Sequence, residues 1–297
     1  RSGITTFRQI VKYFPKSPEM PLLSKQMSDE FAKLFLDGGA QSLPPLVALA
    51  LYYDYRELTP VGPEGDEIIS KLADRLVSVD LLNRAADLLE HQSQYRLRGE
   101  DRARTGARLA VVYLLDRNPD GALKALQTTN AQNLSAPVQQ ERRLLEARAL
   151  GDLERFPEAL NLLGQDQSAD AGALRAELHW RNKDWLAFAR VAGLTLNNRA
   201  SDPAPLTVDE RKLVLQLAVA YALSNDTASL DRLRRSYEAR FRDTSDADTF
   251  SAIVTSVSRN AGDPRQLAAT IAQVGQYEAF MSRYRERVAK GGLSAIN

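Results

Sequence analysis

The chain of 297 residues contains no cysteine and only two histidines. The absence of cysteine excludes a disulfide framework, a thiolate zinc site and a cysteine nucleophile. His91 and His179 lie far apart and form neither of the HExxH and HxH spacings that hold zinc. His91 stands near an expected helix end and His179 beside Trp180, so both are interpreted as structural residues. The sequence therefore predicts no metal site and no cofactor.

Motifs for phosphate binding and for hydrolysis are also absent. Gly38 and Gly39 are typical of a helix end, and the glycines at positions 62 and 65 lack the Lys-Ser/Thr pair that completes a phosphate loop. No GxSxG sequence marks a serine nucleophile. The carboxylate pairs stand near expected helix starts, where negative charge offsets the helix dipole. We therefore expect a chain that is not an enzyme.

Long apolar runs and an excess of charge of one sign are missing as well. The best apolar run, residues 46–53, is far shorter than the roughly 20 residues that cross a bilayer. The 39 basic residues are balanced by 38 acidic ones, which disfavours a dedicated nucleic-acid binder. The lack of cysteine is compatible with the cytoplasm, and we lean slightly toward the bacterial cell envelope. Because the sequence begins Arg-Ser-Gly without a methionine, we expect an excised or processed piece of a larger protein.

Arginine is common and occurs in two clusters. Acidic residues stand between the arginines, and aromatic residues do not alternate with them as they do in stacking platforms for nucleic acid. We interpret both clusters as solvated, salt-bridged faces rather than as a binding patch. The clusters are Arg96, Arg98, Arg102, Arg104 and Arg108, and then Arg232, Arg234, Arg235, Arg240 and Arg242.

Helix-forming residues dominate the rest of the sequence. Ala, Leu and Arg are the commonest types, and the 13 prolines and 16 glycines gather between periodic segments. Asn118 followed by Pro119 is typical of a helix start, and Thr207 with Glu210 predicts a capping box. The sequence therefore predicts an all-α fold of helices joined by short turns.

A spacing of twelve residues recurs between small or apolar residues. Successive first members of the pairs lie 37, 37, 37, 29, 42 and 37 residues apart. This period predicts a series of antiparallel helix hairpins in which small residues allow close approach of the two helices. The pairs are Leu36 with Ala48, Ala73 with Ala85, Ala110 with Ala122, Ala147 with Ala159, Ala176 with Phe188, Ala218 with Leu230, and Thr255 with Leu267.

Residues 141–164 resemble one unit of the tetratricopeptide repeat family, because Ala147 and Ala159 are flanked by Leu150 and Phe156 in the family manner. The resemblance implies a right-handed α-solenoid of about seven hairpins, in which the first helix of each hairpin lines a concave groove. The groove positions lie six before, three before, one after and four after the first small residue. They are Glu67, Ser70, Asp74 and Val77; Arg104, Ala107, Val111 and Leu114; Glu141, Leu144, Arg148 and Gly151; Asp170, Ala173, Glu177 and Trp180; and Lys212, Leu215, Val219 and Ala222.

From these positions we select six candidate binding residues: Asp74, Arg104, Arg148, Glu177, Trp180 and Lys212. The set is mixed in charge. It lacks the lysine-arginine-asparagine clamp with which some family members hold a peptide carboxylate, so a peptide C-terminus is not the expected ligand.

The ends of the array and its irregular segments are assigned from turn-forming residues. Residues 1–25 form an N-terminal extension in which three prolines, Pro15, Pro18 and Pro21, favour extended structure after a short helix or strand at 7–14. Residues 26–290 form the array and residues 291–297 form a tail.

The proline-containing segment 197–206 is either a hinge or a long loop within one continuous solenoid. A helix over 267–288 serves as a capping helix or, alternatively, as a seam for a partner helix.

Two classes of function are compatible with these patterns. The first is a protein-protein interaction scaffold that binds a peptide or helix of a partner protein in its concave groove. The second is the helical superhelix domain of a larger cell-envelope enzyme, similar to lytic transglycosylases, that positions a polymer substrate. A catalytic domain elsewhere in the parent protein would favour the second. A helical-repeat nucleic-acid binder is disfavoured by the near-neutral charge.

Overall fold

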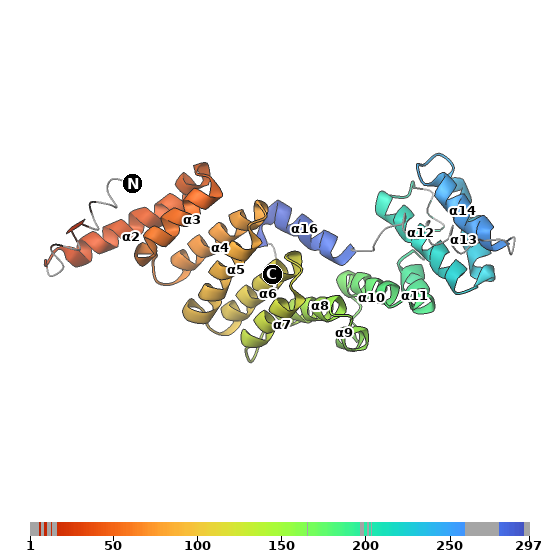
Figure 1. Ribbon diagram of the computed structural model, residues 1–297, viewed down its shortest axis with the longest axis horizontal. Helices are drawn as coiled ribbons and strands as arrows, with labels where there is room; N and C mark the ends of the chain where they lie inside the picture. The colour runs from red at the N-terminus through yellow and green to blue at the C-terminus, as the bar shows by residue number, and fades with distance from the viewer. Residues whose placement is uncertain are drawn as a thin grey trace. The chain divides into compact units, whose positions relative to one another are not determined.

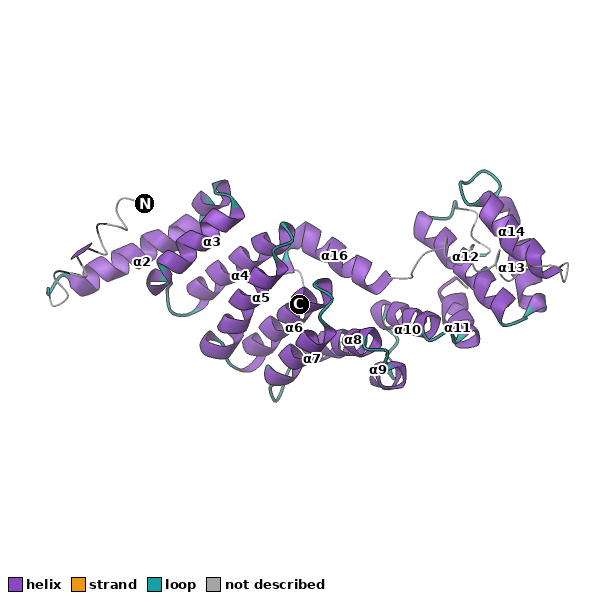
Figure 2. Cartoon of the chain, in the orientation of Figure 1, coloured by secondary structure: helices purple, strands orange, loops and turns teal. Residues whose placement is uncertain are grey.

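The computed structural model describes residues 17–258, apart from 165, 197, 198, 201 and 203, together with 279–293 and isolated positions 6, 9, 10 and 13. Every regular element in these ranges is helical (Figure 2), which confirms the all-α prediction. The α-helices are α2 (Met20–Leu36), α3 (Pro45–Asp54), α4 (Pro63–Ser78), α5 (Leu82–His91), α6 (Gly99–Leu115), α7 (Pro119–Thr128), α8 (Ala136–Asp152), α9 (Phe156–Leu163), α10 (Ala169–Arg181), α11 (Trp185–Leu196), α12 (Val208–Leu223), α13 (Thr227–Phe241), α14 (Ala247–Ser258) and α16 (Ala279–Gly291). Short 3₁₀ segments, η1 (Gly39–Ser42) and η2 (Arg56–Leu58), and one π-turn, η3 (Gln92–Arg96), lie between them.

Helices that follow one another along the chain pack together. Helix α4 contacts α5, α6 contacts α7, α10 contacts α11, and α12 contacts α13. Both members of five predicted pairs are buried: Ala73 and Ala85, Ala110 and Ala122, Ala147 and Ala159, Ala176 and Phe188, and Ala218 and Leu230. The two outer pairs differ. Leu36 is only half-buried and Thr255 is exposed, and Leu267 lies outside the described residues.

One turn recurs with the spacing of these pairs. It places a residue in the left-handed region, with φ between 56° and 61°, at positions 37, 37, 29 and 42 residues apart. The N–H of the following residue then bonds the carbonyl five residues back, as from Leu81 to Leu76 at 2.8 Å, which closes the first helix in a Schellman arrangement. The repeated turn confirms the hairpin spacing. The left-handed residues are Asp80, Arg117, Glu154, Lys183 and Asn225.

Replacing Lys183 with glycine is expected to stabilise the protein. A non-glycine residue in the left-handed region costs roughly 1 kcal/mol, and the Lys183 side chain is exposed. Because glycine also raises the entropy of the unfolded chain, the expected net gain in unfolding free energy is about 0.5 kcal/mol. The matched control is Asn225→Gly, which should gain less because asparagine tolerates this conformation. Urea unfolding measures both; equal gains would contradict the strain argument.

Helix starts follow the predicted turn chemistry. Asn118 accepts a hydrogen bond from the Gly121 N–H at 2.9 Å, and Thr207 with Glu210 forms the predicted capping box. Proline stands in the first turn of α2, α3, α4, α7 and α9, where its missing N–H costs nothing. For the same reason Pro21 does not delay the first helix, and α2 begins at Met20 rather than at residue 26.

The chain divides into two compact units, of which unit 1 comprises Arg1–Ala149 and Arg283–Asn297 and unit 2 comprises Leu150–Ser282. The boundaries between the units fall within α8 and within α16, and the segment 197–206 lies inside unit 2. That segment is tied to unit 2 because Arg199 forms an ion pair with Glu210 at 2.5 Å, and Arg240 donates to the Arg199 carbonyl at 2.5 Å. Around them, unit 2 has a continuous core that includes the stacked rings of Phe241 and Phe250.

The first arginine cluster is less solvated than predicted. Arg96 donates to the Pro60 carbonyl and to the Asp66 carboxylate, both at 2.7 Å, and its side chain is 20% exposed. Arg102 donates to the carbonyl of Thr128, the last residue of α7, at 2.7 Å. The final carbonyls of a helix have no partner within the helix, and the planar guanidinium with five donors is suited to them. These arginines therefore connect neighbouring helices.

A candidate helix-binding face

Within unit 1, helix α16 contacts α8 through Tyr284. The side chain of this tyrosine is fully buried, and its hydroxyl donates a hydrogen bond to Oε1 of Glu141 on α8. The two residues are 143 positions apart in the sequence. Burying a tyrosine requires a partner for its hydroxyl, and the carboxylate supplies one. Tyr284 is therefore one anchor of α16 on unit 1.

The second anchor lies just beyond the end of α16. The backbone N–H of Leu293 donates to Oδ1 of Asp74 on α4 at 2.7 Å, and the Leu293 side chain is 1% exposed. Gly292 adopts φ +67°, and a Cβ placed on it would lie 2.5 Å from Oδ2 of Asp74. Only glycine satisfies both the left-handed conformation and this close approach. The chain thus crosses from α8 back to α4 within ten residues (Figure 1).

Charges of both signs lie beside these anchors. Burial lowers the pKa of Arg108 on α6, and the nearby charge of Asp74 opposes that change. On α16, the Arg287 guanidinium lies over the Tyr284 ring, 4.2 Å from its centroid. Arg285 and Lys290 are exposed, while the side chain of Arg283 lies outside the described residues. We call Asp74 and Glu141, the two acceptors, the helix-binding face of unit 1.

The sequence-predicted residues of unit 1 have three different environments. Asp74 holds the segment after α16, as described above. Arg104 forms an ion pair with Glu100 at 2.6 Å, and its side chain is 37% exposed. Arg148 is 7% exposed. A charge reversal at Arg148 would therefore disturb the fold, and it is not a suitable probe of binding.

The other three candidates belong to unit 2, whereas Asp74 and Glu141 belong to unit 1. Trp180 packs against Trp185 and Phe188, with ring centroids 5.3 and 5.0 Å apart. Glu177 is fully buried on α10, and Lys212 is exposed on α12. Glu141 was among the implied groove positions but not in the shortlist.

Sequence reasoning missed the role of Tyr284 and of the segment after α16. Tyr284 falls within the helix expected over 267–288, and Gly292 within the expected tail 291–297. Helix α16 does end at Gly291, with the Gly292 N–H bonded to the Val288 carbonyl at 2.8 Å. The one available signal was the alternative in which the helix over 267–288 is a seam, because a seam needs a surface to cover it.

Arg104 acts together with Glu100 and Ser135. The carboxylate of Glu100 accepts hydrogen bonds from Arg104, from the Ser135 N–H at 2.8 Å and from the Ser135 hydroxyl at 2.9 Å. These partners, Arg104 first, hold the pKa of Glu100 below its ordinary value of 4.5. The network joins the start of α6 to the residue before α8.

The effect of pH should reveal this network. A carboxyl whose pKa is lowered by folding contributes stability above its ordinary pKa and loses it as the pH falls through the lowered one. We expect Glu100→Gln to destabilise the protein at pH 7 and to match the original chain at pH values where Glu100 is protonated. Urea midpoints measured from pH 7 down to about 3 test this. A difference that stays constant over that range would contradict the ionic contribution.

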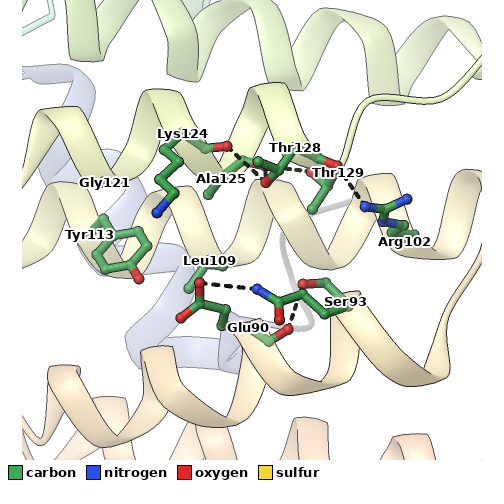
Figure 3. A pocket seen from close by; sticks show the side chains of 11 residues that line it. Glu90, Ser93, Arg102, Leu109, Tyr113, Gly121, Lys124, Ala125, Thr128 and Thr129 are labelled. Carbon is green, nitrogen blue, oxygen red and sulfur yellow. Dashed lines mark hydrogen bonds between the residues drawn. The ribbon is translucent and has the colours of Figure 1, made fainter.

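Two cavities open on unit 1. A cavity of about 370 Å³ adjoins Asp74 and is also lined by Phe35, Ala40, Gln41, Lys71, Leu72 and Arg75. A smaller one of about 110 Å³ lies among α5, α6 and α7, where the side chains of Glu90, Tyr113 and Lys124 surround it (Figure 3). In the smaller cavity, Ser93 donates to the Glu90 carbonyl of α5, and Thr128 and Thr129 donate to carbonyls of α7. The larger cavity is the one that shares a residue with the helix-binding face.

The histidines have the environments expected of structural residues. His91 is exposed at the end of α5, with its ring 5.0 Å from that of Tyr95. His179 is half-buried on α10, and its Nδ1 lies 3.5 Å from Oδ2 of Asp184. Burial lowers the pKa of His179, and the charge of Asp184 partly offsets this. Among the described residues, no three side chains of the His, Cys, Asp and Glu types come together as a metal site.

Comparison with family models, with curated proteins and with solved structures finds no match for this chain. In the part of the chain that the structure describes, none of the helices has the length and apolar character needed to span a bilayer.

Proposed function

We propose that the chain is a non-enzymatic protein-protein interaction scaffold that binds a helix or peptide of a partner protein. The observation that carries this proposal is that Asp74 and Glu141 already hold a helical segment, with Tyr284 and Leu293 buried there. Both acceptors occupy positions that the tetratricopeptide resemblance assigns to the groove. A surface that orders one helix has the shape and the acceptors to order another of similar chemistry.

The proposed architecture is a tetratricopeptide-like, right-handed solenoid. Five buried pairs and five identical left-handed turns with steps of 37, 37, 29 and 42 residues support it. In such an array the first helices stand side by side on one face, and α4 and α8 are both first helices of their hairpins. This is the placement that a binding surface shared by Asp74 and Glu141 requires.

Cross-linking with the intact chain tests the scaffold. The chain is incubated with lysate of the source organism and cross-linked, and the linked residues are mapped by mass spectrometry. We expect a polypeptide linked near Asp74 and Glu141 and lost from the double variant Asp74→Asn/Glu141→Gln, whose substitutions keep side-chain size. The matched control, Asp87→Asn, removes an exposed carboxylate on α5 and should leave the links intact.

Two outcomes count against the scaffold. Links that persist unchanged in the double variant would show that another surface binds the partner. Absence of any linked polypeptide, together with co-sedimentation of the chain with peptidoglycan, would favour the alternative, in which a helical domain of a cell-envelope enzyme positions a polymer.

A further inference from the structure

We propose that the helix-binding face recognises a basic amphipathic helix with a tyrosine and a glycine-containing end, and that α16 occupies this face as an internal competitor. The inference rests on the proposed function, because it names the class of partner for the same surface. It is motivated by the two-point attachment of α16 through Tyr284 and Leu293.

The tyrosine sets the first requirement. Its ring is fully buried and its hydroxyl donates to Glu141, so a phenylalanine would fill the space but leave the carboxylate without this donor. A helix without this hydroxyl is therefore expected to bind several-fold more weakly. An arginine three residues later adds a cation over the ring, as Arg287 does at 4.2 Å. The face therefore selects tyrosine, and an arginine three residues later contacts that ring from within the bound helix.

The end of the bound helix sets the second requirement. Asp74 accepts the N–H of Leu293, a backbone group that becomes available only where the helix has ended. The Cβ position of Gly292 lies 2.5 Å from Asp74, so a larger residue at this point clashes. The distance in sequence between the tyrosine and this N–H, nine residues, fixes the register of the bound segment.

The third requirement is positive charge. Within α16, four basic residues at 283, 285, 287 and 290 accompany one acid, Glu286, whereas the face carries the two carboxylates with Arg108 beside Asp74. Opposite charges on two surfaces favour their encounter and disfavour acidic competitors. Partner binding is therefore expected to weaken as salt increases.

Competition follows because α16 belongs to the same chain as Asp74 and Glu141. A tethered segment has an effective concentration on the order of millimolar, so a free helix must overcome it before it can bind. Only molecules in which α16 has left the face can bind a partner. The apparent affinity is therefore the intrinsic affinity multiplied by the fraction of such molecules. Weakening either anchor of α16 should therefore increase binding from solution.

A peptide of residues 279–293 with a fluorescent label tests this directly against the intact chain. We expect the variants Tyr284→Ser and Gly292→Ala, which weaken the two anchors separately, each to bind the peptide at least about tenfold more tightly than the original chain. A peptide carrying Tyr284→Phe should bind several-fold more weakly. The chain variant Tyr284→Ser/Glu141→Gln should lose the discrimination between the two peptides, because Glu141 is what distinguishes them.

The inference is overturned if neither anchor variant gains affinity, or if the Tyr284→Phe peptide binds as well as the original. It is also overturned if the anchor variants form concentration-dependent dimers that bind no peptide, because a second copy of the chain would then be the occupant. Thermal unfolding of each variant confirms that the helices remain folded. If the peptide does not bind but the cross-links to a partner remain, only this inference is refuted. If the peptide binds but no partner is cross-linked, the result counts against the scaffold.

Discussion

Replacing Gly106 with alanine is expected to destabilise unit 1 by about 2–3 kcal/mol, as overpacking of a core does. In an exposed helix interior the same substitution is stabilising by up to roughly 1 kcal/mol. Gly106 lies on α6, and a Cβ placed on it would lie 1.8 Å from Oγ1 of Thr129. The Thr129 hydroxyl donates to the Ala125 carbonyl at 2.6 Å and is buried, so it cannot move away without losing that bond.

Two glycines provide matched controls. Gly172 on α10 and Gly193 on α11 have no atoms within 4 Å of the position a Cβ would take. Gly172→Ala and Gly193→Ala should each stabilise the protein by up to about 1 kcal/mol. Urea unfolding monitored by circular dichroism measures all three variants. A stabilising effect of Gly106→Ala would contradict the close packing of α6 against Thr129.

Replacing Arg142 with methionine is expected to lower the unfolding free energy by about 3 kcal/mol, because buried carbonyls lose a charged donor. Arg142 is 7% exposed on α8. Its Nη1 donates to the Ala103 carbonyl at 2.6 Å and its Nη2 to the Leu126 carbonyl. One guanidinium thus joins α8 to both α6 and α7. Burial lowers the pKa of Arg142, and the nearby charge of Glu146 opposes that lowering.

Two further variants separate the geometry of Arg142 from its charge. Arg142→Lys keeps the charge but lacks the planar fork, so it should recover only part of the loss. The neighbouring Arg143 is exposed, and Arg143→Met should change stability by less than about 0.5 kcal/mol. Full recovery by lysine would show that charge alone is required. Equal losses at positions 142 and 143 would contradict the connection between hairpins.

Local features of the fold were predictable from sequence because they depend on residues close together in the chain. Ala110 with Ala122 marks two facing helices, and the Asn118 cap sets the start of α7. The arginine contacts were not predictable in the same way. Arg142 reaches a carbonyl 39 residues away, and any residue type can supply a carbonyl, so no side-chain pattern signals the bond.

Of the two parts of the candidate site, only the face formed by Asp74 and Glu141 was predictable from the sequence. The register of the hairpins placed Asp74 and Glu141 among the groove positions, and both are acceptors for the segment that contains α16. The segment that occupies this face was not predictable, because Leu293 and Asp74 are 219 residues apart in the sequence. No periodic pattern connects positions so far apart.

Amide hydrogen exchange across α16 tests the central claim most directly, namely that Asp74 and Glu141 hold this helix on unit 1. The account predicts that the amides of residues 284–293 exchange far more slowly than in the free peptide of residues 279–293. In the Tyr284→Ser chain this protection should fall, while the amides of α12 keep theirs. Exchange in the original chain at the rate of the free peptide would contradict the claim, as would protection that Tyr284→Ser leaves unchanged.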